Sequence, residues 1–343
     1  MTAPHPLVTR ARSLADDLLA PHAEQVDQGE VPAIHLAEIR RSGLLGLNAP
    51  QEYGGAAAPG AVVRETTEIL AGACCSTWFV QAQHHTPVLT LAGNEGPARE
   101  RLLGPLATGE LLSGVAYAHL RAYPRRPVRV TRERGGWRFD GTVPWYTGWG
   151  LNDVLLLAGV TDADEVLFAF TEARERPGLR PSAPLRLAAL TAARTVSLEL
   201  DGLWLPEDAV ALRTAHGRWS AADRLRTVNA NPAVFGLTEA ALSLLDEATA
   251  APLRARLTEV RDRAYALVDG AAPEEHLADR LALRTQAHEV MRTATTAAVV
   301  TGGGRSMLLT NRAQRLAREA LFLMVQAQTQ ESRAAHLDAL TDG

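Results

Sequence analysis

Apolar positions follow a helical period at both ends of the chain and a period of two in its middle. From residue 5 to about 112, apolar residues recur every three to four positions, and glycine and proline separate the segments. Between about 113 and 213, apolar and polar residues alternate, and the runs 153–160 and 165–171 are joined by a polar link. The alternation predicts an antiparallel β module with one solvated face.

From about residue 215 the helical period returns. One apolar face predicts a helix over 237–248, and further helices fit 252–270, 274–300 and 306–340, with breaks at Pro273 and at Gly302, Gly303 and Gly304. Helices of this length predict an antiparallel bundle. We therefore expect an α+β, mainly α chain with domains at 1–112, 113–213 and 214–343.

Composition and charge narrow the function classes. A hydrophobic fraction of 46% and a charged fraction of 22% are those of an ordinary soluble protein. The net charge of −4 gives no basic face for nucleic acid, and no run suits a membrane surface or a bilayer span. The adjacent Cys74 and Cys75 predict free thiols in a reducing compartment. The N-terminal residues lack the pattern of a secretory signal, so we expect a cytoplasmic protein.

Aromatic residues are scarce except between Gly141 and Gly150. This stretch holds Trp145, Tyr146 and Trp149 beside the hydroxyl of Thr147. A flat, partly apolar wall with one hydroxyl suits a planar heteroaromatic ring such as a flavin. The alternative, favoured by the stretch taken alone, is that the tryptophans fill a sheet core.

Four segments, in order and spacing, resemble the acyl-CoA dehydrogenase superfamily. They are Gly-Leu-Leu-Gly-Leu-Asn-Ala-Pro-Gln-Glu-Tyr-Gly-Gly at 43–55, the flavin-segment match at 141–148, Leu-Asp-Gly-Leu-Trp-Leu-Pro-Glu-Asp-Ala-Val at 200–210, and the glycines 302–304 followed by Arg-Glu-Ala at 318–320. The resemblance implies a three-domain fold: an N-terminal helical domain, a middle antiparallel β domain and a C-terminal four-helix bundle.

The resemblance also implies a flavin, usually FAD and alternatively FMN, between the β module and the bundle. Residues Trp145, Tyr146 and Thr147, with Gly148 in the turn, would line the ring, and Thr147 could donate to its N5 edge. The backbone at Tyr117 and Ala118 would touch the ring, with Ala118 in place of the family's threonine. The cofactor set is completed by Gly302, Gly303, Gly304 and Arg318. The glycines would let backbone amides approach the dinucleotide; their alternative role is a helix end and turn.

The family's usual catalytic base has no counterpart. Where the resemblance implies a glutamate, the chain has Ala327 after Gln326, and the second location used by some members holds Arg226 and Thr227. Two carboxylates, Asp223 and Glu331, are nearby, but each is displaced by at least one helical turn.

A monooxygenase branch of the superfamily, resembling dibenzothiophene monooxygenase, is matched in part. Its turn resembles Tyr146-Thr147-Gly148, its aspartate matches Asp153, and its histidine falls near His84-His85. Its C-terminal histidine would fall near Gln326. The catalytic candidates are therefore His85 and Gln326, although the histidine pair could equally serve in packing. No third ligand at metal spacing accompanies the pair, so no metal site is expected.

These features predict a flavin-dependent oxidoreductase acting on a small molecule, with an acyl-CoA thioester as the substrate class that the resemblance implies. The alternatives are a monooxygenase of the same fold, or a catalytically degenerate partner subunit. The region 306–327 is apolar around much of its circumference, which predicts a homodimer or homotetramer built through the bundle.

Overall fold

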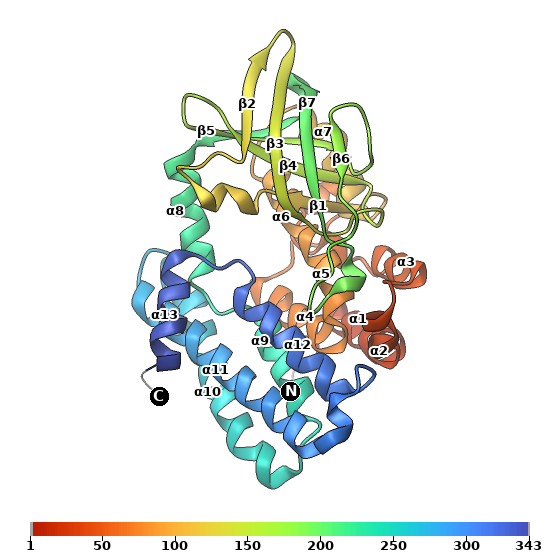
Figure 1. The fold of residues 1–343 in the computed structure, drawn as a ribbon, viewed down its shortest axis with the longest axis vertical. Coiled ribbons are helices and arrows are strands. Elements are labelled where there is room, and N and C mark those ends of the chain that lie inside the picture. The colour runs from red at the N-terminus through yellow and green to blue at the C-terminus, as the bar shows by residue number, and fades with distance from the viewer. Residues whose placement is uncertain (1–2, 342–343) are drawn as a thin grey trace.

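The computed structural model describes residues 3–341 of the chain. Figure 1 shows the β-sheet at one end of the long axis and the C-terminal helices at the other. The N-terminal helices lie beside both, so three groups of elements meet near the middle of the molecule. Within the described residues, no helix combines the length and the apolar character that crossing a membrane requires.

The N-terminal part is helical, as predicted. Its helices are α1 (Pro6–Leu14), α2 (Ala20–Gln28), α3 (Ala33–Arg41), α4 (Gly60–Ala73), α5 (Cys75–Gln83), α6 (His85–Ala92) and α7 (Pro97–Thr108). A π-helical turn at Ala15–Leu19 joins α1 to α2. Proline in the first turn of α7 and Gly109, at a φ of 81°, just after its end are the residues that favour these two helix boundaries.

The middle part is one eight-stranded sheet. Its strands are β1 (Ser113–Ala116), β2 (Val128–Glu133), β3 (Gly136–Tyr146), β4 (Val154–Val160), β5 (Glu165–Glu172), β6 (Leu179–Pro181), β7 (Val196–Pro206) and β8 (Val210–Ala215). Seven run in the order β6-β7-β3-β2-β4-β5-β8, and β1 pairs with β4 in parallel. The predicted hairpin is confirmed, because Val154–Val160 pairs with Glu165–Glu172 in antiparallel register.

The expectation of one solvated sheet face is wrong for β4 and β5. In β4, Leu155 and Leu157 belong to one buried cluster, whereas Leu156 and Ala158 belong to another. The second cluster includes residues of α6 and α7, so helices cover this face of the sheet. A nearly continuous apolar run is the pattern of a strand that is buried on both faces.

The C-terminal part contains α8 (His216–Thr227), α9 (Pro232–Leu242), α10 (Glu247–Gly270), α11 (Leu277–Gly302), α12 (Arg312–Val325) and α13 (Gln330–Thr341). Helices α9 to α12 pack against one another, and α13 packs on α11.

Two of the helix predictions are wrong in their bounds. The helix expected over 237–248 ends at Leu242, and Asp246 caps a new helix that contains Pro252 near its start. The helix expected over 306–340 is interrupted by a short 3-10 turn, Gly303–Met307, and by residues 326–329. At the second break Ala327 has a φ of 53°, a left-handed conformation that ends α12 without glycine or proline.

The N-terminal and C-terminal helices share one hydrophobic core. Two glycines permit close contact between α4 and α9: a Cβ on Gly236 would lie 2.0 Å from the carbonyl oxygen of Glu68, and one on Gly72 would lie 2.6 Å from the carbonyl oxygen of Gly236. The two helical parts are therefore held in one arrangement around the region where they meet the sheet.

Candidate functional site

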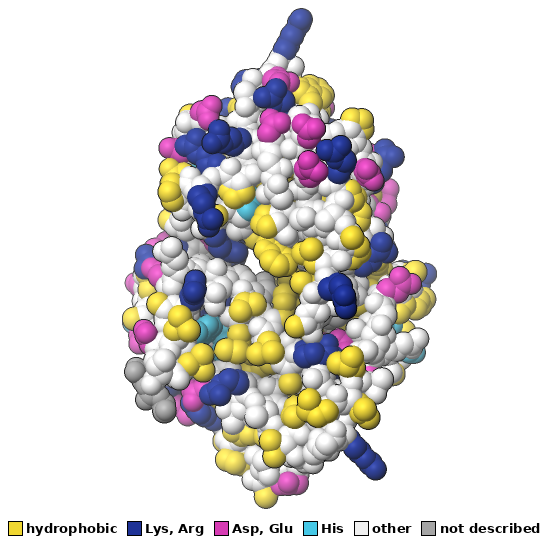
Figure 2. Space-filling view, in the orientation of Figure 1, with side chains coloured by type: hydrophobic (Ala, Val, Ile, Leu, Met, Phe, Trp, Pro, Cys, Tyr) yellow, Lys and Arg dark blue, Asp and Glu magenta, His cyan; other side chains and the backbone are white. Residues whose placement is uncertain are grey.

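A cavity of about 1010 Å³ lies where the three groups of elements meet. Its walls come from α4, α5, the end of β1, the end of β3, the loop before β7, the connection between α8 and α9, α10, α11 and the end of α12. Figure 2 shows this face hollowed near its middle, with hydrophobic side chains around the hollow. The volume is at the upper end of the range for small-molecule and cofactor sites.

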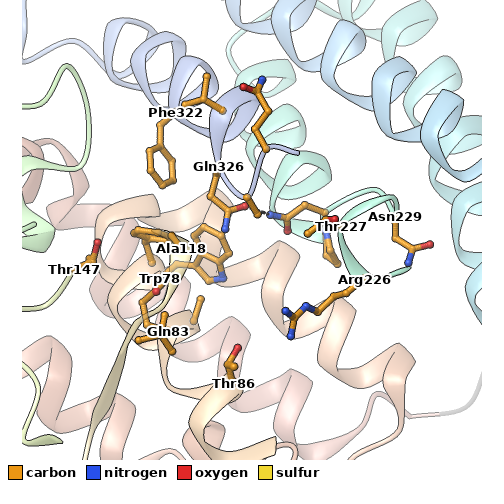
Figure 3. A pocket seen from close by; sticks show the side chains of 18 of the residues that line it. Trp78, Gln83, Thr86, Ala118, Thr147, Arg226, Thr227, Asn229, Phe322 and Gln326 are labelled. Carbon is orange, nitrogen blue, oxygen red and sulfur yellow. Dashed lines mark hydrogen bonds between the residues drawn. The ribbon is translucent and has the colours of Figure 1, made fainter. Parts of the chain in front are cut away.

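One wall carries Trp145 and Thr147. The indole of Trp145 is 53% exposed although it lines a cavity, so a large apolar surface is uncovered. The hydroxyl of Thr147 is 3.0 Å from that of Thr195. In the close-up of Figure 3, Thr147 lies on one side of the cavity and Arg226 on the other, with Trp78 and Gln326 between them.

Of the four residues expected at the ring, Trp145 and Thr147 line this cavity, whereas Tyr146 and Gly148 do not. Tyr146 is fully buried in the core of the sheet, where its hydroxyl accepts a hydrogen bond from Asn152 at 3.0 Å and burial raises its pKa. Successive side chains of a strand point to opposite faces, which is why Tyr146 is turned away from the side of its two neighbours. Gly148, at a φ of 92°, forms a turn where a Cβ would lie 2.3 Å from the Asn152 amide nitrogen.

Tyr117 and Ala118, which follow β1, both line the cavity. The Tyr117 ring also contacts Phe168 and Trp219 edge-on, with ring centroids 5.8 and 6.4 Å away. This packing fixes the ring between the sheet and α8. Because Ala118 has no hydroxyl, the backbone is the only polar part of that residue that could meet a ligand.

The predicted dinucleotide residues divide into two groups. Arg318 on α12 lines the cavity, donates to the carbonyl oxygen of Ala188 at 3.1 Å and forms an ion pair with Asp27 of α2. The glycines 302–304 are exposed and do not line the cavity; they form the end of α11 and the turn after it.

The two catalytic candidates are separated in the same way. Gln326 lines the cavity and its side-chain oxygen accepts a hydrogen bond from Asn231 at 3.1 Å. His85 does not line it: its Nε2 lies 2.7 Å from Nε2 of Gln81, and burial lowers its pKa to about 4. The neighbouring His84 joins α7 to β1, donating to the carbonyl oxygen of Leu106 and accepting from the amide of Ser113.

No carboxylate and no histidine is found among the cavity-lining residues of the described chain. Ala327, Arg226 and Thr227, which stand at the two positions where the resemblance implies a base, all line the cavity. The nearby carboxylates are engaged elsewhere: Asp223 is buried in ion pairs with Arg121 and Arg226, and Glu331 forms an exposed ion pair with Arg224. Neither of these two carboxylates therefore lines the cavity.

Sequence reasoning missed three groups of the wall. Arg284, Arg121 and Tyr265 line the cavity, and the Tyr265 hydroxyl donates to Glu68 at 2.5 Å. Arg284 and Tyr265 lie in the middle of regular helices, where a local pattern gives no signal of a site. Among the described residues, histidines, cysteines and carboxylates do not gather into any group suited to hold a metal ion.

Comparison with known proteins agrees with this architecture. Residues 5–110 match the family described as acyl-CoA dehydrogenase, N-terminal domain. The chain is 26% identical over 208 residues to a probable acyl-CoA dehydrogenase of Mycobacterium leprae (strain TN), which is 58% of this chain and 53% of the relative. It is 28% identical over 183 residues to a dibenzothiophene monooxygenase of Rhodococcus erythropolis, which is 51% of this chain and 44% of the relative. In sequence, the chain thus spans about half the length of the curated relatives it matches.

The fold extends over the whole chain. The structure of butyryl-CoA dehydrogenase from Megasphaera elsdenii superposes with a TM-score of 0.83 over 99% of both chains, at 17% identity. At that identity the likeness concerns the fold alone. The predicted resemblance is confirmed: the chain has the three-domain acyl-CoA dehydrogenase fold, and its residues 5–110 match the acyl-CoA dehydrogenase N-terminal domain in sequence.

Proposed function

We propose that the protein is a flavin-dependent oxidoreductase of the acyl-CoA dehydrogenase superfamily that works without the usual glutamate base. The observation that carries the proposal is the uncovered indole of Trp145 beside the Thr147 hydroxyl, on the wall of a large cavity in this fold. A flat apolar surface of this size is suited to stack on a planar ring, and the hydroxyl can meet a polar ring edge.

The residues present fit a flavin ring better than they fit a whole dinucleotide. Trp145, Thr147 and the backbone at Tyr117 and Ala118 would hold the ring. When bound, a flavin can accept a hydride from a carbon atom of the substrate. We propose FAD as the cofactor, as the resemblance implies. FMN is the alternative, because the glycines 302–304 lie outside the cavity of their own chain.

Cofactor retention tests this assignment without relying on turnover. The purified protein is expected to be yellow, and mass spectrometry of the released cofactor will distinguish FAD from FMN. Trp145→Ala and Thr147→Val should lower the flavin bound per chain. Trp204→Ala is the matched control, because Trp204 is an exposed tryptophan on β7 that does not line the cavity. Flavin content that is equal in all three variants would contradict the assigned wall.

The absence of a lining carboxylate predicts weak activity as an ordinary acyl-CoA dehydrogenase. Removal of the proton next to a thioester carbonyl requires a base within hydrogen-bond reach, and loss of a general base costs about 10² to 10⁴ in rate. Anaerobic mixing of the flavin-loaded protein with acyl-CoAs of several chain lengths should leave the oxidised flavin band largely intact. Rapid bleaching by any of them would overturn this part of the proposal.

A monooxygenase is the second candidate, supported by the Rhodococcus relative and by the same missing carboxylate. Oxygen uptake by the reduced, flavin-loaded protein with hydroxylated or sulfoxidised product would favour it. A protein that binds no flavin would instead support the third possibility, a degenerate partner subunit.

We also propose assembly as a homodimer or homotetramer through the bundle. Large hydrophobic side chains are exposed around the end of α11 and the following turn, namely Val300, Met307, Leu308 and Leu309. On α12, Leu316 and Leu323 are buried in the core, whereas Leu321 is 60% exposed. Light scattering should give at least twice the chain mass at micromolar concentration, and a stable monomer would contradict the proposal.

A further inference from the structure

Arginines dominate the charge of the cavity wall. Five line it: Arg64, Arg121, Arg226, Arg284 and Arg318. Four of them form ion pairs: Arg64 pairs with Asp269, Arg318 pairs with Asp27, and Arg121 and Arg226 both pair with Asp223. Within residues 3–341, Arg284 is the one lining arginine that has no carboxylate within ion-pair distance.

Arg284 is a deeply buried cation, with 3% of its surface exposed. Its guanidinium donates to the carbonyl oxygens of Thr227 at 2.9 Å, Asn229 at 3.4 Å and Gln326 at 3.3 Å. Its Nε is buried with no partner. Burial, and the nearby charge of Arg121, lower its pKa to about 10, so it remains protonated near neutral pH. Carbonyl dipoles satisfy some of its hydrogen bonds but supply no counter-charge, and an unpaired buried charge is costly.

The residues around Arg284 add to this excess of positive charge over negative charge. Arg121 and Arg226 share the single carboxylate of Asp223, so adding Arg284 leaves this part of the wall with more guanidinium groups than carboxylates. Figure 3 shows Arg226, Thr227 and Asn229 together on one side of the cavity, facing Gln326. The two segments that Arg284 joins are those of Thr227 and Gln326. The resemblance implies a base at Arg226 or Thr227 in the first segment, or at Ala327 in the second. This chain therefore presents positive charge close to the positions where the resemblance implies a carboxylate.

We propose that the substrate itself carries a carboxylate and that Arg284, assisted by Arg226, binds it. The inference rests on the proposed function, since it names the substrate class of that same cavity. A guanidinium presents its N–H donors in a planar fork that matches the two oxygens of a carboxylate. A neutral straight-chain acyl group in the same place would leave Arg284 without a counter-charge, whereas a carboxylated one supplies it.

Calorimetric titration of the full chain tests the assignment, with and without added flavin. The probes are malonate, its neutral analogue malonamide, and inorganic phosphate. Malonate should bind, and malonamide should bind about 10- to 100-fold more weakly, because a charged hydrogen-bond partner has been removed. Equal binding of malonamide, tighter binding of phosphate, or no binding of malonate would each overturn the proposal.

Variants locate the site. Arg284→Met should weaken malonate binding about 10- to 100-fold, and Arg284→Lys should restore part of it. Arg256→Met is the control for net charge, because Arg256 forms an exposed ion pair with Glu289 outside the cavity. Malonate binding unchanged in Arg284→Met would refute the site.

Loss of folding and loss of flavin binding can both be distinguished from loss of carboxylate binding. Arg284 also donates hydrogen bonds to backbone carbonyls, so circular dichroism must show that Arg284→Met is folded. If it is not folded, the proposal is tested by Arg226→Met and by the wild-type comparison of malonate with malonamide. Failure to bind flavin would contradict the proposed function, whereas the titrations without flavin would still measure binding at the carboxylate site.

Discussion

Replacing Glu319 by glutamine should destabilise the protein more than any change at an exposed ion pair. Arg315 of α12 is 1% exposed, and its Nη1 donates to both carboxylate oxygens of Glu319 at 3.0 and 2.8 Å. Its Nε donates to Glu24 of α2 at 3.1 Å, which ties the C-terminal bundle to the N-terminal helices. Glu319→Gln keeps the shape of the side chain but removes the buried negative charge.

The expected magnitude follows from burial. Breaking a buried ion pair by removing one partner costs about 3 to 5 kcal/mol. Glu24 remains beside Arg315, so we expect the lower end, about 3 kcal/mol. With an unfolding entropy of about 2.1 cal/mol/K per residue, a chain of 343 residues loses about 4 °C in Tm.

Scanning calorimetry can resolve this change against a matched control. Glu331→Gln removes the partner of Arg224 in a pair whose side chains are 45% and 51% exposed. Exposed pairs contribute about 0 to 1 kcal/mol, so Tm should fall by about 1 °C or less. Equal shifts in the two variants would refute the reasoning that the Arg315 cluster is held by buried charge.

Two further changes test the packing and the acid response of the fold. Gly236→Ala should cost about 1 to 3 kcal/mol in urea unfolding, because its Cβ would collide with the Glu68 carbonyl. The control Gly217→Ala, which meets nothing within 4 Å, should be neutral or stabilising. For Asp223, burial raises the pKa, but the hydrogen bonds and charges of Arg121 and Arg226 outweigh burial and hold the pKa below its ordinary value. Its contribution is therefore present above the ordinary carboxyl pKa of about 3.9 and is lost as pH falls below that value; urea midpoints measured from about pH 6 to pH 3 should fall less steeply in Asp223→Asn than in the wild type.

Periodicity predicted the elements whose boundaries are made by local chemistry. The β4–β5 hairpin followed from two apolar runs around a polar link. The break between α12 and α13 was missed because Ala327 takes a left-handed conformation that glycine or asparagine normally signals. Only the surrounding contacts, which sequence does not reveal, stabilise an alanine there.

The candidate site shows the same division between local and spatial information. That Trp145 and Thr147 share a face while Tyr146 points away follows from the period of two in a strand, so the sequence already contained this distinction. Arg284 is different: it lies within a regular helix, and its meaning arises because Thr227 and Gln326, 57 and 42 residues away in sequence, meet around it. A missing glutamate read from the sequence suggests only that a base has been lost. The buried guanidinium of Arg284, which has no counter-charge, lies beside the position of that glutamate and changes the interpretation. It favours a cavity that selects an anion over a cavity that has only lost its catalytic function.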